Sequence, residues 1–294
     1  MWFWKKKAPI RFKPHSERRM SISKLFAPAK VNLTLHVTGQ RKDGYHLLDS
    51  LVVFADVGDR VTVMAADDTS LEVSGPMAAG VPTDGSNLVL KAAALYDQPV
   101  RILLSKYLPS AAGIGGGSAD AAATVLALAE LTGDTRLPDV SVLGADTRVC
   151  LMRQAARMSG IGEVVAPVIG LPPLFAVLAN PGVDVPTPAV FKALSHKQNR
   201  SMPKRLPQGQ KLPAFVKWLA DQRNDLQAPA IAQAPVIGDC LAALSALPGA
   251  RLARMSGSGA TCFALFDSRD AARAQAKKLA DQHPVWWVTD TEFF

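Results

Sequence analysis

Residues 109–122 read PSAAGIGGGSADAA and place four glycines within five positions, immediately before an alanine-rich stretch. Glycine inside a helix or strand destabilises it by roughly 0.5–1 kcal/mol relative to alanine. Such a dense group of glycines therefore indicates a loop whose backbone must curl tightly or approach another group closely. Such a loop at the start of a helix exposes backbone N–H groups beside the positive end of the helix dipole. The chemistry that this arrangement favours is the binding of an anion, above all a phosphate chain.

The spacing of this loop excludes two common phosphate-binding motifs. A Walker A loop places Lys and then Ser or Thr after its last glycine, where this chain has Ser118 and Ala119. A dinucleotide fingerprint counted from Gly113 requires a sixth-position glycine, and Ser118 stands there. One interpretation without any ligand stays open, which is a tight turn between a strand and a helix.

The elements around the loop must hold it in place. Alternating apolar residues and turn signals predict strands over 30–37, 59–66, 70–75 and 100–108, and a helix over 87–96. A further helix is predicted over 118–133, with Ser118 capping its first turn, Asp120 complementing its dipole and Gly133 ending it.

The second half of the chain also mixes strand and helix patterns. Strands are predicted around a glycine turn in 155–168, in 171–182, on both sides of the turn at 256–259, and at the C-terminus. Helices are predicted in 187–196, 213–232, 235–249 and 268–282. Because strands and helices do not alternate as regular βαβ units, the sequence predicts an α+β protein of two lobes, over 20–166 and 167–294.

The net charge of +8 is concentrated at one end of the chain. Residues 1–19 carry +6 and the remaining residues only +2, so we interpret 1–19 as a disordered basic extension and expect no nucleic-acid partner. A nucleic-acid or membrane-surface arm is the alternative. These residues lack the apolar core of a secretory signal, and no apolar stretch is long enough to span a membrane. Three widely spaced cysteines are typical of buried thiols in a reducing compartment, here the cytoplasm.

Three segments together resemble one superfamily. The glycine-rich segment is similar to the phosphate-binding motif of the GHMP kinases, APAKVNLTLHV (27–37) to their N-terminal motif, and RMSGSGATCFALF (254–266) to their C-terminal motif. The resemblance implies a two-lobed α+β fold. Its N-terminal lobe would resemble ribosomal protein S5 domain 2, its C-terminal lobe would be ferredoxin-like, and the active site would lie in the cleft between them.

The resemblance also implies a reaction, in which ATP with Mg²⁺ phosphorylates a small-molecule alcohol. Asp146 matches the catalytic acid residue that accepts the hydroxyl proton, and Lys30 matches the lysine that keeps this carboxylate charged. Without the motifs, the simpler interpretation is that Asp146 is a turn or helix-cap residue and that Lys30 is a solvated lysine at the end of a strand. No metal ligand is assigned. The ATP-binding loop would comprise Pro109, Ser110, Ala111, Ala112, Gly113, Ile114, Gly115, Gly116, Gly117, Ser118 and Ala119.

Further segments resemble the branch of the superfamily that phosphorylates the 2-hydroxyl of 4-diphosphocytidyl-2-C-methyl-D-erythritol, a cytidine diphosphate methylerythritol of the non-mevalonate isoprenoid pathway. They include PAKVNLTLHVTGQRKDGYHLLDSL, SGIGE and VPTPAVFKAL. In that branch Tyr45, His46 and Phe191 would hold the cytosine, and Asn32 would reach the polar tail. Core aromatics and a hydrogen-bonded turn histidine are the alternatives for these residues.

Several choices stay open at this stage. The turn at 256–259 either supports the phosphate loop or lets two elements pack closely. The chain has Ser110, Ala111 and Ala112 where the family has more glycine, and Thr147 and Arg148 where it more often has small apolar residues and proline. The rival functions are a mevalonate- or homoserine-type kinase and a non-catalytic binding protein on the same fold. The sequence predicts no oligomeric state.

Overall fold

The computed structural model describes residues 22–134 and 136–294, and the predicted basic extension at 1–19 lies outside the described residues. Eleven strands belong to one sheet. They are β1 (Ile22–Asn32), β2 (His36–Gln40), β3 (His46–Ala65), β4 (Ser70–Ser74), β5 (Val100–Ser105), β6 (Ala156–Gly160), β7 (Val164–Pro167), β8 (Leu174–Asn180), β9 (Leu252–Met255), β10 (Cys262–Phe266) and β11 (Trp287–Phe293).

The described residues also form eight α-helices and one 3₁₀ turn. They are α1 (Leu88–Ala93), α2 (Gly116–Thr132), the 3₁₀ turn η1 (Ser141–Leu143), α3 (Ala145–Met152), α4 (Thr187–Lys192), α5 (Leu212–Ala220), α6 (Gln227–Gln233), α7 (Val236–Ser245) and α8 (Arg269–Gln282). None of the described helices combines the length and apolar character that crossing a membrane requires.

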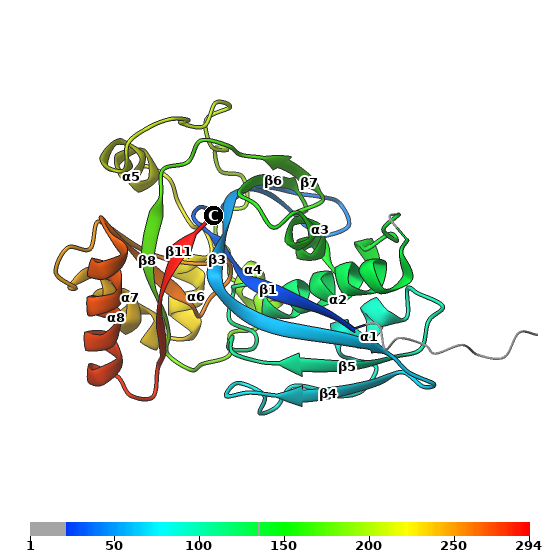
Figure 1. The fold of residues 1–294 in the computed structure, drawn as a ribbon. Helices are drawn as coiled ribbons and strands as arrows, with labels where there is room; N and C mark the ends of the chain where they lie inside the picture. The colour runs from blue at the N-terminus through cyan, green and yellow to red at the C-terminus, as the bar shows by residue number, and fades with distance from the viewer. Residues whose placement is uncertain (1–21, 135) are drawn as a thin grey trace, which may run out of the picture.

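The 20-residue strand β3 organises the sheet. It pairs antiparallel with β1, β2, β5 and β6, and its middle meets the C-terminal strand β11 at the Ala55–Phe293 pair. From β11 the sheet continues through β8 and β10 to β9. Figure 1 shows β3 at the centre, with the N-terminal elements β4, β5 and α2 on one side and α7 and α8 on the other. The two lobes of the expected α+β fold are therefore joined through β11.

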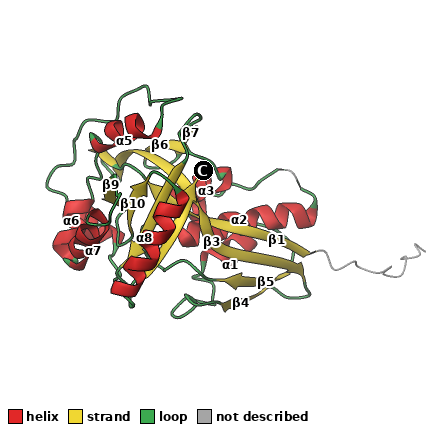
Figure 2. Cartoon of the chain, turned by 60° about the vertical axis from the view of Figure 1, so that its left-hand side comes forward, coloured by secondary structure: helices red, strands yellow, loops and turns green. Residues whose placement is uncertain are grey.

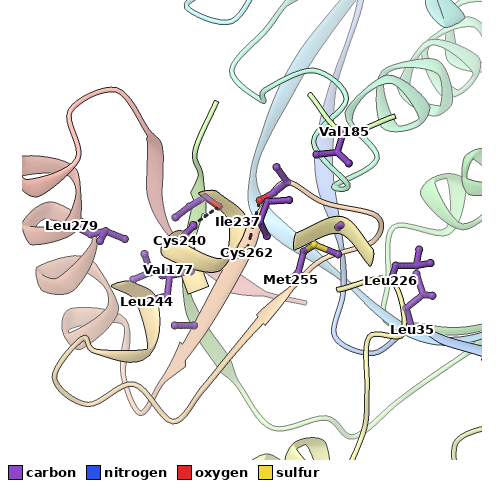
Figure 3. Packing of buried hydrophobic residues seen from close by; sticks show 14 of the residues in the cluster. Leu35, Val177, Val185, Leu226, Ile237, Cys240, Leu244, Met255, Cys262 and Leu279 are labelled. Atoms are coloured by element: carbon purple, nitrogen blue, oxygen red, sulfur yellow. Dashed lines mark hydrogen bonds between the residues drawn. The ribbon is translucent and has the colours of Figure 1, made fainter. Parts of the chain in front are cut away.

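Each lobe has its own hydrophobic core. In the N-terminal lobe the alanine face of α2 packs against β1 and β3, because alanine side chains let a helix lie close to a sheet. In the C-terminal lobe α7 and α8 cover one face of β8 and β10, as Figure 2 shows with α8 in front of these strands. Figure 3 shows this core, in which Cys240 and Cys262 lie among aliphatic side chains.

All three cysteines are free and buried, which confirms the prediction of buried thiols. The strand β8 is buried on both faces: Val177 belongs to the core under α7 and α8, and Leu178 to a second core that includes residues of α5. A continuous apolar run is what such a doubly covered strand requires.

The start of α2 differs from the prediction. The helix begins at Gly116 instead of residue 118, its N-cap is Gly115 with φ +64°, and no side chain caps it, so Ser118 is not a cap. Asp120 consequently lies in the second turn, where it accepts a hydrogen bond from Lys106 Nζ at 2.8 Å instead of facing the helix end. The predicted C-terminal end is confirmed, because Gly133 is the C-cap with φ +73°.

Two further predictions are wrong in detail. The strand predicted over 30–37 is two strands, β1 and β2, because the chain turns at 33–35, where Leu33 N–H donates to Leu51 O and Leu35 bridges to Asn224. The helix predicted over 213–232 is two helices, α5 and α6, and the Arg254 guanidinium donates hydrogen bonds to Leu219 O near the end of α5 and to Gln222 O in the segment between them. Both breaks depend on contacts with residues far away in the sequence.

Candidate active site

A cavity of about 910 Å³ opens between the two lobes. Its wall is made by the end of β1, the β2–β3 turn, the glycine loop, the start of α3, α4 and the turn at 257–258. These segments span residues 30 to 258 in sequence, so only the folded chain brings them together.

The glycine loop forms one end of this cavity. Gly113 and Gly115 have φ values of +72° and +64°, in the region that favours glycine, and Ala111 has φ +49°. Since α2 starts at Gly116, the N–H groups of its first turn have no partner within the helix. They lie at the positive end of a 17-residue helix, which is a favourable place for phosphate.

The predicted loop residues divide into two groups. Seven of the eleven line the cavity: Ala111, Ala112, Gly113, Gly115, Gly116, Gly117 and Ser118. Ala119 is buried in the core of the N-terminal lobe and Ile114 in the core that includes residues of α5, and Pro109 and Ser110 do not line the cavity. The positive φ at Ala111 gives a physical reason why glycine is the more usual residue at this place.

The small-residue turn at 256–259 supports the loop by direct contact. Ser256 Oγ donates a hydrogen bond to Gly113 O at 2.9 Å and accepts one from Asn32 N–H at 3.0 Å. A Cβ built on Gly113 would lie 2.5 Å from Ser256 O and 2.8 Å from Gly259 N. The turn at 256–259 thus both packs closely against the loop and supports it by hydrogen bonding.

Lys30 and Asp146 meet beside the glycine loop. Lys30 Nζ lies 2.9 Å from Asp146 Oδ2, with side-chain exposures of 5% and 36%. Lys30 lies on β1 and its backbone N–H donates to Ile114 O in the loop at 2.9 Å, whereas Asp146 lies in the first turn of α3. The carboxylate is the more accessible partner, so a molecule in the cavity can reach it while the lysine stays fixed from behind.

A short hydrogen-bond chain fixes the lysine. Lys30 Nζ donates to Asn32 Oδ1 at 2.9 Å, Asn32 Nδ2 donates to Ser50 Oγ at 2.7 Å, and Ser50 Oγ donates to Thr34 O at 2.5 Å. Asn32 keeps one amide hydrogen for a ligand. The sequence gives no local signal for Ser50, because it enters the site only through the pairing of β3 with β1.

The opposite end of the cavity is aromatic. His46 and Phe191 stack on each other, with ring centroids 4.8 Å apart and an interplanar angle of 26°. Because they are already in contact, they form one wall and a base cannot lie between them. Tyr45, 61% exposed on the β2–β3 turn, also lines the cavity. The three predicted residues therefore gather at one end.

His46 has an unused polar atom at this wall. Its Nε2 is buried without a hydrogen-bond partner. Burial, and then the positive charge of Lys197, lower the pKa of the imidazole below its usual value. A neutral ring has one donor and one acceptor nitrogen, which suits the edge of a nucleobase. Lys197 and Lys192 also line the cavity, and the sequence did not single out either residue.

Of the residues that depart from the family pattern, Ala111 and Ala112 line the cavity, whereas Thr147 and Arg148 do not. Thr147 is buried, with an Oγ1 that has no hydrogen-bond partner. Arg148 is exposed and does not line the cavity. Among the described residues no group of three His, Cys, Asp or Glu side chains is arranged to hold a metal ion.

Comparisons with known proteins match both halves of the chain. The model of the GHMP kinases N terminal domain matches residues 87–169, and that of the GHMP kinases C terminal region matches residues 210–285. The 4-diphosphocytidyl-2-C-methyl-D-erythritol kinase of Dinoroseobacter shibae is 59% identical over 268 residues, covering 90% of this chain and 93% of that protein. The protein of the same name from Cereibacter sphaeroides is 57% identical over 272 residues, covering 91% and 98%.

A solved structure agrees with these relatives. The crystal structure of a 4-(cytidine 5'-diphospho)-2C-methyl-D-erythritol kinase superposes with a TM-score of 0.74 at 34% identity, and it covers 92% of this chain and 98% of its own. The two matched domains, the extent of the alignments and the shared architecture confirm the predicted family and fold. The chain belongs to the GHMP kinase superfamily and, within it, to the family of the 4-diphosphocytidyl-2-C-methyl-D-erythritol kinases.

Proposed function

We propose that this kinase transfers the γ-phosphoryl group of ATP to the 2-hydroxyl of 4-diphosphocytidyl-2-C-methyl-D-erythritol. The observation that carries the proposal is a single cavity that joins three features. They are a glycine loop suited to a phosphate chain, a lysine–carboxylate pair beside it, and an aromatic wall at the far end. A donor and an acceptor that both carry phosphates and a base require a site with phosphate-binding and base-binding parts.

The glycine loop and the first turn of α2 bind the triphosphate. Gly116 and Gly117 line the cavity, and the N–H groups of this first helical turn have no acceptor within the helix. Mg²⁺ is expected to enter on the ATP phosphates, because the described residues do not group three ligands and this ion usually keeps several waters. When bound, it neutralises charge on the phosphates.

Asp146 accepts the proton of the attacking hydroxyl. The hydroxyl oxygen forms a bond to the γ-phosphorus as the bond to the ADP oxygen breaks, and the O–H proton passes to the Asp146 carboxylate. Lys30 Nζ, 2.9 Å from Oδ2, holds this carboxylate in place and stabilises negative charge that develops on the oxygen. Asn32, held by Lys30 and Ser50, orients the methylerythritol end with its free amide hydrogen.

The wall of His46 and Phe191 holds the cytosine. The base stacks on this wall and Tyr45 closes over its other face. Stacking of a base on aromatic rings contributes about 1–3 kcal/mol. The cavity-lining cations Lys192 and Lys197 favour an acceptor that carries phosphates.

The proposal also covers the lobe boundaries, the cellular location and the kind of partner. The N-terminal lobe would comprise 20–166 and the C-terminal lobe 167–294, the protein would act in the cytoplasm, and its partner would be a small molecule rather than a nucleic acid or a membrane. A mevalonate- or homoserine-type kinase is not favoured, since relatives at 57–59% identity are named for the cytidine-linked substrate.

The test measures ADP formation with ATP, Mg²⁺ and the cytidylylated methylerythritol, compared with mevalonate and homoserine. We expect turnover with the cytidine-linked alcohol alone. Asp146→Asn should lower kcat by roughly 10²–10⁴-fold with little change in KM for ATP. Asp139→Asn, an exposed acid seven residues earlier, is the matched control. Near-full turnover by Asp146→Asn would remove Asp146 from its role, and activity on mevalonate instead would overturn the substrate.

A further inference from the structure

Three buried charged side chains lie beneath the glycine loop, outside the residues assigned to the reaction above. Lys106 follows β5, Asp59 lies on β3 and Asp120 on α2, with side-chain exposures of 4%, 0% and 3%. Lys106 Nζ donates to Asp120 Oδ2 at 2.8 Å and also to Asp59 Oδ2. We call these residues the buried charge cluster. Charged groups are rarely buried this completely without a reason in structure or function.

The buried charge cluster holds both ends of the loop. Asp59 Oδ1 accepts hydrogen bonds from Tyr107 N–H at 2.6 Å and Leu108 N–H at 2.9 Å, the two residues that precede Pro109. Asp120, at the other end, is attached through Lys106 to the same carboxylate. The ends of the loop are therefore fastened to one residue of β3.

The cluster also lies close to the proposed phosphate site. A Cβ on Gly116 would lie 3.5 Å from Lys106 Nζ and 3.8 Å from Asp59 Oδ2. Gly116 opens α2, whose free N–H groups face the cavity. Any change in the charge of the cluster therefore acts directly on an anion bound by this turn, because little water lies between them to screen it.

The hydrogen bonding of the buried charge cluster leaves one carboxylate oxygen without a partner. Two carboxylates share one ammonium, and Asp120 Oδ1 is buried with no hydrogen-bond partner. An ionised oxygen in that position is strongly disfavoured. Burial raises the pKa of Asp120 to about 8, Lys106 opposes this rise, and the negative charge of Asp59 adds to it.

The other titratable groups near Asp120 do not change charge in the same range. For Lys106, burial disfavours the charged form, but the two carboxylates outweigh it and raise the pKa above its usual value. Cys150 on α3 faces the same region, and burial raises the pKa of this thiol, so it stays neutral. Asp59 accepts hydrogen bonds from two backbone N–H groups and from the Lys106 ammonium.

We propose that Asp120 is a positioning residue that carries a proton when nucleotide binds, so that the buried charge cluster is neutral beneath the triphosphate. Loss of this proton in alkaline solution leaves a net negative charge under the loop and weakens nucleotide binding. Binding at a pH where Asp120 is partly ionised consequently takes up protons. This inference rests on the proposed ATP site, and it concerns nucleotide affinity rather than the acceptor.

The experiment is calorimetric titration of the full chain with a non-hydrolysable ATP analogue and Mg²⁺ between pH 7 and pH 9. The negative charge that Asp120 carries at pH 9 repels the phosphates, so Kd should be several-fold higher at pH 9 than at pH 7. Titrations at pH 8 in buffers of different ionisation enthalpy should show uptake of a fraction of a proton. Asp120→Asn, which keeps the shape, should show a Kd constant within about twofold and no uptake at this site.

Asp270→Asn removes an exposed acid from the first turn of α8 in the other lobe and should behave as the wild type. Equal pH dependence in Asp120→Asn and the wild type would overturn the inference. Absence of proton uptake by the wild type would overturn it too, and this measurement needs no variant to fold. Failure of every protein to bind the analogue at any pH would instead refute the proposed ATP site.

Discussion

Two glycines of the same loop, Gly113 and Gly117, should respond to alanine in opposite ways. Gly113 has φ +72°, and a Cβ there would lie 2.5–2.8 Å from backbone atoms of Ser256 and Gly259. Gly117 lies in the first turn of α2 without a positive φ, and its Cβ would meet only Leu88 Cδ1 at an ordinary 3.6 Å. The fold therefore requires glycine at 113. At 117 the fold has room for a side chain, and only a ligand in the cavity would limit its size.

The size of the effect at Gly113 follows from two contributions. A left-handed conformation costs an alanine roughly 1–2 kcal/mol, and forcing a methyl group into packed backbone typically costs about 1–3 kcal/mol. A loss of about 2–5 kcal/mol lowers Tm by roughly 5–15 °C in a protein of this size. The turn at 256–259 has to move with the loop, so activity should fall as well.

Gly117→Ala should instead keep or raise Tm, because alanine favours a helix over glycine by up to about 1 kcal/mol. Its methyl group projects toward the proposed triphosphate, so KM for ATP should rise by roughly tenfold or more, while KM for the acceptor changes little. Thermal melting without nucleotide and steady-state kinetics with each substrate varied provide the two measurements. If Gly117→Ala left KM for ATP unchanged, or if Gly113→Ala melted like the wild type, the reasoning about this loop would be refuted.

Two further predictions concern stability. His36 is buried, its Nε2 accepts from Arg223 N–H at 3.1 Å, and burial lowers its pKa. The unfolded chain therefore binds a proton near pH 6.5 that the folded chain does not, and stability should fall by at most about 1.4 kcal/mol per pH unit below that pH. Urea unfolding of the wild type and His36→Gln between pH 7.5 and 5 tests this, and an equal slope in both would contradict it. Arg254 is buried and donates to three carbonyls, those of Leu33, Leu219 and Gln222. Arg254→Met should lower the free energy of unfolding by about 3 kcal/mol or more by leaving them unpaired, with Arg254→Lys in between, and a loss below 1 kcal/mol in urea unfolding would count against the role assigned to this residue.

Local patterns predicted most of the elements, because they depend on neighbouring residues. The apolar alternation of β5, the apolar runs of β8 and β10 and the glycine that ends α2 are local signals, and each was confirmed. The start of α2 was not predicted correctly. A sequence pattern assigns the cap to Ser118, but the left-handed Gly115 already starts the helix.

The candidate site was predicted by motif rather than by geometry. Lys30 and Asp146 are 116 positions apart, and only the pairing of β1 with β3 and the packing of α3 bring them within 2.9 Å. Ser50 and the buried charge cluster have no local signature. Lys106 and Asp59 read as ordinary surface residues until burial, at 3% and 0% exposure, shows that they are not.

The sequence by itself determined the family, the glycine loop and the types of residue available for chemistry, because these are encoded in short contiguous stretches. The tertiary structure alone decided which glycine serves the fold and which faces the cavity, which aromatic rings form one wall, and which charges lie in water. The physical reason is that strain, burial and ionisation depend on what surrounds an atom in space. At this site those surroundings come from β1, β3, α2, α3, α4 and the turn at 256–259, which meet only when the two lobes are joined.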